Sequence, residues 1–183
     1  NEIKPALKLD KRIGQHSYIN AQLGLSGGNL ERDIASTINI AKSFNLNYEL
    51  MGSFLQINNQ RKNWVFDTVN KFVFPKLKNP KIAILGLSYK ANTNSVKNAP
   101  SLLLLNQLKG KKLIAFDPIV NVKDLVTWCE QAKSPEEASS NADVIIVLTP
   151  WSEIIDVTLK PTNTAIKNKF FLDPFNVFDK EKI

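Results

Sequence analysis

The sequence is poor in the residues that bind metals or form disulfides. Its 183 residues include one cysteine, Cys129, and one histidine, His16. A single cysteine excludes an internal disulfide, so nothing indicates an oxidising compartment. The lone histidine has no second histidine or cysteine at ligand spacing, so we expect no metal site. No Ser-His-Asp order is present either, which argues against a serine hydrolase.

Long apolar runs are also absent. No uncharged apolar stretch of about 18 residues occurs, the length at which a membrane-spanning helix is considered. Residues 1–5 lack the basic-then-apolar layout of a signal peptide. We therefore expect no membrane association and a cytoplasmic location. The first residue is not Met, and the segment through Lys11 has no recognisable start of a fold, which suggests a fragment of a longer chain.

Positive charge is in excess. Lysine and arginine number 24 against 17 aspartates and glutamates, a net charge of +7. This balance suits nucleic acid, an anionic membrane or a phosphorylated small molecule. The lysines are scattered rather than gathered on one helical face with interleaved aromatics. Solvated surface lysines are therefore the plainest interpretation, nucleotide phosphate comes next, and nucleic acid is not expected as a partner.

Two helical patterns occupy the first part of the chain. A glycine and serine turn over residues 23–28 precedes Asn29, which can cap a helix that ends near Asn45. A second pattern runs from about Glu49 to Val73, and its length suggests an interdomain or subunit-packing helix. Two prolines and two lysines over residues 74–80 then predict a linker, where we place the domain boundary.

Strand and helix patterns alternate after this linker. We expect helices over residues 100–108, from just after Ser134, and over residues 151–157. We expect strands over residues 81–87, 112–116, 126–129, 143–148 and 169–172. This alternation predicts an α/β fold with a parallel, doubly wound sheet.

Ligands of such a sheet bind at the carboxyl ends of strands, where the winding reverses. That rule points to residues 86–100, to Asp117 and to residues 149–151. The loop 86–100 has one glycine at its start rather than a GxGxxG fingerprint, so binding of NAD by this half is not expected. Lys90 and Lys97 flank a polar run in this loop, a composition that suits a diphosphate; a long solvated loop is the alternative.

Several blocks along nearly the whole chain resemble, in order, those of one enzyme family. They are Asp10-Lys11-Arg12-Ile13-Gly14, the turn Gly24 to Asp33, Ile57-Asn58-Asn59-Gln60-Arg61, Ile84 to Lys90 with Asn92-Thr93, Ala99-Pro100-Ser101, Phe116-Asp117-Pro118, Asn141-Ala142-Asp143 and Thr149-Pro150-Trp151. The chain is similar to the C-terminal half of the UDP-glucose/GDP-mannose dehydrogenase family of nucleotide-sugar dehydrogenases.

This resemblance implies an architecture and an activity. It implies a helical dimerisation region over residues 1–75, followed by a Rossmann-like UDP-binding domain over residues 81–183. The family's NAD-binding domain is N-terminal and lies outside this chain. The full-length protein would be an NAD-dependent oxidoreductase acting on an alcohol of a nucleotide sugar. It would be a homodimer built on the long helix and would serve polysaccharide synthesis.

The resemblance also implies roles for matching residues. Asp33 matches an aspartate that assists water or the substrate alcohol. Lys90 matches a lysine that contacts the sugar nucleotide, and Gly27 and Tyr89 lie in the matching substrate-binding motifs. Arg12 matches an arginine that reaches the substrate of a neighbouring subunit. Lys97 stands where the family has an arginine near the cofactor.

Position 29 departs from the family. Family members oxidise an alcohol to an acid, and a cysteine at this position holds the intermediate as a thioester. Asn29 can donate and accept hydrogen bonds but cannot form an acyl-enzyme, and Cys129, in a predicted strand, does not replace the thiol. Phe175 stands where the family has an arginine, and Asn94 and Ser95 replace acids. An inactive nucleotide-sugar-binding paralogue, acting as a regulator or partner, is therefore the alternative.

Overall fold

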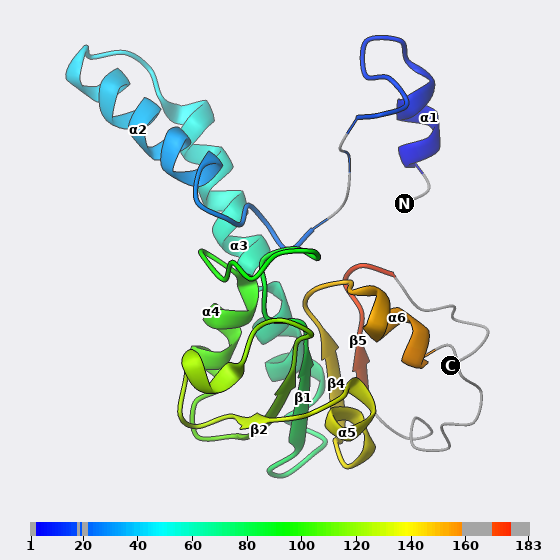
Figure 1. The fold of residues 1–183 in the computed structure, drawn as a ribbon. Coiled ribbons are helices and arrows are strands. Elements are labelled where there is room, and N and C mark those ends of the chain that lie inside the picture. Colours follow the sequence, from blue (N-terminus) through cyan, green and yellow to red (C-terminus); the bar gives the residue numbers. More distant parts are fainter. Residues whose placement is uncertain (1–2, 18, 20–21, 159–169, 177–183) are drawn as a thin grey trace.

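The computed structural model describes residues 3–17, 19, 22–158 and 170–176. Figure 1 shows a helical hairpin of α2 and α3 that projects from a layered α/β unit. The helices are α1 (Ile3–Leu9), α2 (Leu30–Ser43), α3 (Glu49–Phe72), α4 (Pro100–Gln107), α5 (Pro135–Ser140) and α6 (Ser152–Thr158), and the strands are β1 (Lys81–Leu85), β2 (Lys112–Phe116), β3 (Glu130–Gln131), β4 (Val144–Val147) and β5 (Phe170–Leu172).

The helical region follows the sequence patterns, with one exception. Helices α2 and α3 begin at Leu30 and Glu49, as expected, and end within two residues of the predicted ends. The expectation of no recognisable structure before Lys11 is wrong, because residues Ile3–Leu9 form α1. None of its residues is buried, so no apolar periodicity toward a core marks it in the sequence.

The sheet is parallel throughout, in the order β3-β2-β1-β4-β5, which confirms the predicted α/β class. Ile82 of the central strand pairs with Leu113 on one side and with Val144 on the other. The chain builds the sheet outward from β1 to β3, then returns to the other side for β4 and β5. The winding therefore reverses between β1 and β4.

One predicted strand is wrong. Residues 126–129 form no strand, and the edge strand β3 follows them at Glu130–Gln131. Val126 and Cys129 are buried in the core cluster, but they reach it from an irregular segment that follows a short 3-10 turn at Val122–Asp124. Their apolar spacing comes from this packing rather than from a pleated strand.

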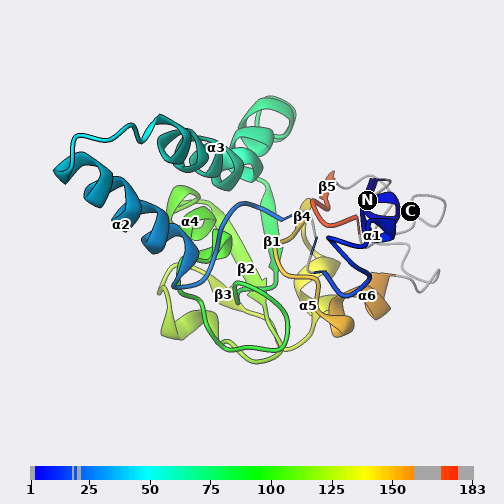
Figure 2. The same ribbon diagram turned by 90° about the horizontal axis from the view of Figure 1, so that it is seen from above.

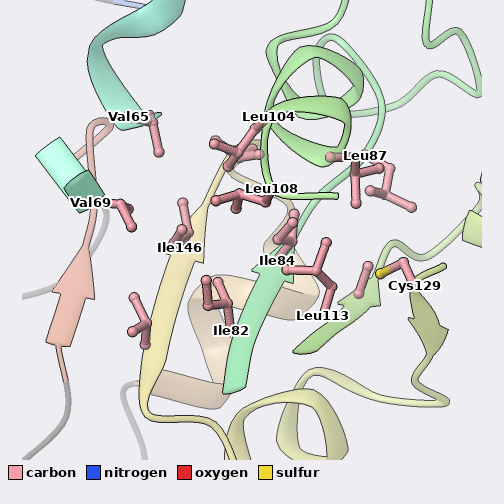
Figure 3. Packing of buried hydrophobic residues seen from close by; sticks show 14 of the residues in the cluster. Val65, Val69, Ile82, Ile84, Leu87, Leu104, Leu108, Leu113, Cys129 and Ile146 are labelled. Atoms are coloured by element: carbon pink, nitrogen blue, oxygen red, sulfur yellow. The ribbon is translucent and has the colours of Figure 1, made fainter. Parts of the chain in front are cut away.

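Helices cover both faces of the sheet, as Figure 2 shows from above. On one face, Val65 and Val69 of α3 and Leu104 of α4 pack on the central strands (Figure 3). On the other face, Ala138 of α5 and Ile154 of α6 pack on β1 and β4. The lower half of the long helix is thus part of the α/β core, while its upper half projects with α2.

Local chemistry accounts for the element ends. Strand β1 ends two residues earlier than predicted because Gly86 adopts a φ of +92°, which breaks the extended chain. Helix α5 has the expected cap: Ser134 Oγ accepts a hydrogen bond from Glu137 N at 3.1 Å. Among the described helices, none is both long and apolar enough to cross a membrane.

Candidate functional site

The crevice at the switch point between β1 and β4 is closed. A Cβ atom added to Gly86 would lie 2.4 Å from Thr149 Cβ and 2.6 Å from Thr149 N. Thr149 Oγ1 donates a hydrogen bond to Ser88 O at 2.5 Å, and Thr149 is buried. The two loops that leave the carboxyl ends of β1 and β4 therefore contact each other at Gly86 and Thr149.

Asp117, at the end of β2, holds this arrangement together. Its Oδ2 accepts hydrogen bonds from Leu87 N at 2.7 Å, from Ser88 N at 3.1 Å and from Trp151 Nε1 at 3.0 Å. Its Oδ1 accepts bonds from Ile119 N at 3.0 Å and Val120 N at 2.9 Å. An acid after the second strand is where a dinucleotide-binding fold holds a ribose.

Here that acid is fully used by the protein's own donors. Asp117 is 5% exposed and Trp151 is 3% exposed. Asp117, Thr149 and Trp151 thus form internal contacts of the switch point, and a ligand site at residues 117 and 149–151 stays a prediction.

The open cavity lies instead where the α/β unit meets the helical hairpin. Its volume is about 880 Å³. Its lining residues come from the glycine turn, from α2 and α3, and from the loop after β1; they are Gln22, Gly24, Leu25, Ser26, Leu30, Ile34, Met51, Phe54, Ile57, Asn58, Arg61, Tyr89 and Lys90. Arg61 and Lys90 are cations, and among the described residues no aspartate or glutamate lines the cavity. Such a cavity favours an anionic ligand.

The glycine turn and the loop after β1 are in direct contact. Gly27 N donates a hydrogen bond to Lys97 O at 3.0 Å. A Cβ atom at Gly27 would lie 3.2 Å from the Tyr89 ring, and one at Gly28 would lie 3.1 Å from Lys97 Cδ. The structure thus brings Gly27, Tyr89 and Lys97 together, and it places Lys90 Nζ 5.5 Å from the centre of the Tyr89 ring.

Asn58 of α3 fixes the other end of the turn. Its Oδ1 accepts a hydrogen bond from Leu25 N at 2.5 Å, and Asn58 is buried. Gly24, at a φ of +92°, allows this approach, because a Cβ there would lie 2.6 Å from Asn58 Oδ1. A side chain at position 24 would push the turn away from the helix.

Three polar side chains meet beside the turn, and we call them the Lys62 cluster: Glu31, Lys62 and Asn98. Lys62 Nζ donates hydrogen bonds to Glu31 and, at 2.7 Å, to Asn98 Oδ1. Asn98 Nδ2 donates to the same Glu31 carboxylate. Burial raises the pKa of Glu31, but the hydrogen bonds from Lys62 and Asn98 and the charge of Lys62 outweigh it, so this pKa lies below its ordinary value.

Asn29 and Asp33 stand at the start of α2, outside the cavity lining. Asn29 occupies the cap position, but its side chain makes no capping bond, so the predicted side-chain cap is wrong. The exposed Asp33 carboxylate accepts bonds from Arg32 Nε at 3.1 Å and Nη2 at 3.0 Å. Asn29 lies between Gly28, which faces Lys97, and Leu30, which lines the cavity.

Arg12 is not brought to this site. It lies after α1, and its Nη2 pairs with Asp10 Oδ2 at 2.6 Å. Its side chain is 89% exposed, and it does not line the cavity. A site role for Arg12 therefore requires a second molecule or another part of the protein.

Cys129 is inert packing, as expected. It is 1% exposed, and burial raises the pKa of its thiol to about 12. Phe175, at the position where an arginine was expected, packs against both core clusters.

Sequence reasoning missed Glu31, Asn58, Lys62 and Asn98. A signal for two of them existed in α3. Asn58 and Lys62 lie seven and three residues before the buried Val65, on the face that packs inward. Polar residues that interrupt a buried helical face mark a site or a bonded network.

Comparisons with known proteins identify one enzyme family. Residues 83–180 match the model of the UDP binding domain of the UDP-glucose/GDP-mannose dehydrogenase family. The UDP-glucose 6-dehydrogenase of Rickettsia conorii is 28% identical over 190 residues, covering 98% of this chain and 43% of that protein. UDP-glucose 6-dehydrogenase TuaD of Bacillus subtilis is 27% identical, covering 100% and 40%. The chain thus spans about two fifths of the length of these relatives.

Solved structures show the same fold. A UDP-glucose dehydrogenase from Pyrobaculum islandicum superposes with a TM-score of 0.76 at 19% identity, covering 95% of this chain and 43% of that one. A UDP-D-ManNAc dehydrogenase from Pyrococcus horikoshii gives 0.73 at 21% identity, with 98% and 42% covered.

Proposed function

Because this chain belongs to the UDP-glucose/GDP-mannose dehydrogenase family, we propose that it forms the substrate-binding half of an NAD-dependent nucleotide-sugar dehydrogenase. The observation that carries the proposal is the cavity of about 880 Å³ at the meeting of the glycine turn, α3 and the loop after β1. Two cations line it without an opposing acid. A nucleoside diphosphate attached to a sugar has the charge and the size class that suit this cavity.

Lys90 and Arg61 are the proposed phosphate partners. Lys90 is exposed at the head of the loop, so its ammonium can move to an incoming anion. Arg61 reaches the cavity from α3, where its Nε donates to Gln22 O at 3.1 Å. This bond holds the guanidinium in place and leaves other N–H donors for an anion. Tyr89 offers a ring beside the turn.

NAD is proposed to bind outside this chain. The switch-point crevice, the usual dinucleotide site in such a sheet, is filled by Thr149 and closed by Asp117. The residues of this chain therefore recognise the nucleotide sugar and leave the redox cofactor to a further domain. Lys97, beside Gly28, is proposed to face that cofactor.

Asn29 limits the proposed reaction. Conversion of a primary alcohol to an acid removes four electrons in two steps, and the family's thiol carries the intermediate between them. An amide is neither a nucleophile nor a leaving group of that kind. With Asn29 the oxidation therefore stops after two electrons, and Asp33 remains as a group that can assist the alcohol.

The proposed limit of two electrons is tested by counting the NADH formed. The full-length protein is incubated with a panel of UDP and GDP sugars and NAD, and NADH released per mole of sugar consumed is measured by absorbance. One equivalent with an aldehyde product is expected. Two equivalents with an acid product would contradict the role given to Asn29.

A second candidate function is a binding module without turnover. The lost thiol at position 29 and the phenylalanine at position 175 favour it, because the nucleotide cavity does not depend on either. Binding of UDP or GDP sugars with no NADH formed across the panel would select this function. Upstream sequence with a strand, GxGxxG and a helix would favour the enzyme.

We also propose that the protein is a homodimer through the α2–α3 hairpin. Ile40, Phe44, Leu50, Ile57 and Trp64 of this hairpin are exposed apolar side chains. Such a surface is large for a monomer. A partner subunit's Arg12 would then complete the site. We expect the full-length protein to sediment as a dimer and Ile40→Glu, at an exposed position outside the cavity lining, to sediment as a monomer.

A further inference from the structure

We propose that Lys62 is a positioning residue that holds the glycine turn of residues 24–29 against the loop of residues 86–99, so that a nucleotide on the loop also orders the turn. The inference about the nucleotide rests on the proposed function. The connection between turn and loop does not rest on the proposed function, because it consists of hydrogen bonds within the chain.

The Lys62 cluster joins three segments that are distant in sequence. Glu31 lies in the first turn of α2, Lys62 lies in α3, and Asn98 lies near the end of the loop. Lys62 Nζ bonds both Glu31 and Asn98, and Asn98 bonds Glu31 in turn, so every pair within the cluster is connected. Of the ion pairs in the described part of the chain, this is the one that links the turn's helix to α3.

Burial makes this cluster strong for its size. The Lys62 side chain is 9% exposed, so water can solvate its ammonium only poorly if its partners move away. A buried charge that loses its partner costs more than the pair contributes when intact. The hydrogen bonds of Lys62 therefore hold the turn and the loop in one arrangement.

Other contacts reach the same turn but are individually weaker. Gly27 N bonds Lys97 O, and Tyr89 lies against Gly27. The stem of Lys62 also touches the turn, since a Cβ at Gly24 would lie 3.2 Å from Lys62 Cγ. Loss of the Lys62 ammonium therefore releases the Glu31 end of the turn, while the hydrogen bond from Leu25 N to Asn58 Oδ1 still holds the other end.

The first test needs no ligand. In the full-length protein, Lys62→Met is compared with wild type and with Lys62→Arg. Lys71→Met is the control, because Lys71 is an exposed lysine of the same helix. Hydrogen exchange by mass spectrometry follows residues 24–29, with residues 144–147 of β4 as the reference. We expect about tenfold faster exchange in the turn of Lys62→Met, the factor that corresponds to about 1.4 kcal/mol, and an unchanged rate in β4.

Lys62→Arg keeps the charge and should keep the turn's exchange near wild type. Equal exchange in Lys62→Met and Lys71→Met would overturn the inference. So would faster exchange in β4 to the same extent as in the turn, because that result indicates general destabilisation.

The second test adds UDP. In wild type, UDP should slow exchange in both the loop and the turn; in Lys62→Met it should slow the loop alone. Protection of the turn in Lys62→Met equal to that in wild type would contradict the coupling. No protection of the loop in either protein would instead contradict the proposed nucleotide site, and the ligand-free comparison would still decide the role of Lys62.

Discussion

Gly86→Ala is the sharpest test of the closed switch point. Gly86 has a φ of +92°, and its absent side chain points at the loop after β4. A methyl group there would sit 2.4 Å from Thr149 Cβ and 2.6 Å from Thr149 N. Both distances are far inside van der Waals contact, and the second involves backbone, so a rotamer change cannot relieve it.

The expected cost has two parts. A left-handed φ costs an L-residue about 1 to 2 kcal/mol, and a methyl group forced into a packed region costs about 1 to 3 kcal/mol more. The unfolding free energy should therefore fall by about 2 to 5 kcal/mol. Gly110→Ala is the matched control, because Gly110 has a φ of +89° with nothing within 4 Å of an added Cβ. It should cost the backbone part alone, about 1 to 2 kcal/mol.

Urea unfolding followed by far-ultraviolet circular dichroism measures both changes, with the m-value as a check that the transition stays comparable. A loss about 1 to 3 kcal/mol larger for Gly86→Ala than for Gly110→Ala is expected from the packing part. Equal losses for the two variants would refute the close contact between the loops, and with it the reason for excluding a dinucleotide from this crevice.

Three further predictions concern single side chains. Asn29→Cys in the full-length protein should raise the NADH formed per mole of nucleotide sugar from one to two; no change would show that position 29 does not limit the oxidation. Glu31 has a lowered pKa, so its stabilising contribution is present above its ordinary pKa of 4.5 and is lost as the pH falls through the lower native value. Glu31→Gln should therefore show a smaller loss of unfolding free energy on acidification, and an identical pH profile would count against the cluster. Burial raises the pKa of Cys129 from 9.0 to about 12, so the contribution of the buried thiol to stability is complete below pH 9.0 and declines above it. The difference in unfolding free energy between wild type and Cys129→Ala should therefore shrink as the pH rises above 9.0. A constant difference would contradict the burial of the thiol.

The fold follows from local patterns. The apolar runs of β1 and β4 and the proline at the start of α4 are visible in the sequence, and the alternation of strand and helix determines a parallel sheet. Two short elements were not predictable. Helix α1 buries no residue, and the two-residue strand β3 is a pairing of Glu130 and Gln131 with β2, which depends on the neighbouring strand rather than on its own composition.

The location of the site was less predictable than the fold. The rule that ligands bind at the switch point indicated Asp117 and Thr149, but their side chains are used to close that crevice. Whether a carboxylate binds a ligand or its own backbone depends on distances that the sequence does not contain. The resemblance in motifs identified Tyr89 and Lys90 of the cavity, while the bonds that hold them near the glycine turn depend on the packing of α3.

We propose that the cavity beside Lys90 binds the diphosphate of a nucleotide sugar. Isothermal titration of the full-length protein with UDP and with GDP, for wild type, Lys90→Met and the exposed control Lys78→Met, tests it most directly. Loss of a charged hydrogen bond of about 1.5 to 3 kcal/mol predicts a dissociation constant raised by about tenfold or more in Lys90→Met and unchanged in Lys78→Met. Equal affinity in all three proteins, or no binding of either nucleotide to wild type, would contradict a diphosphate site beside Lys90.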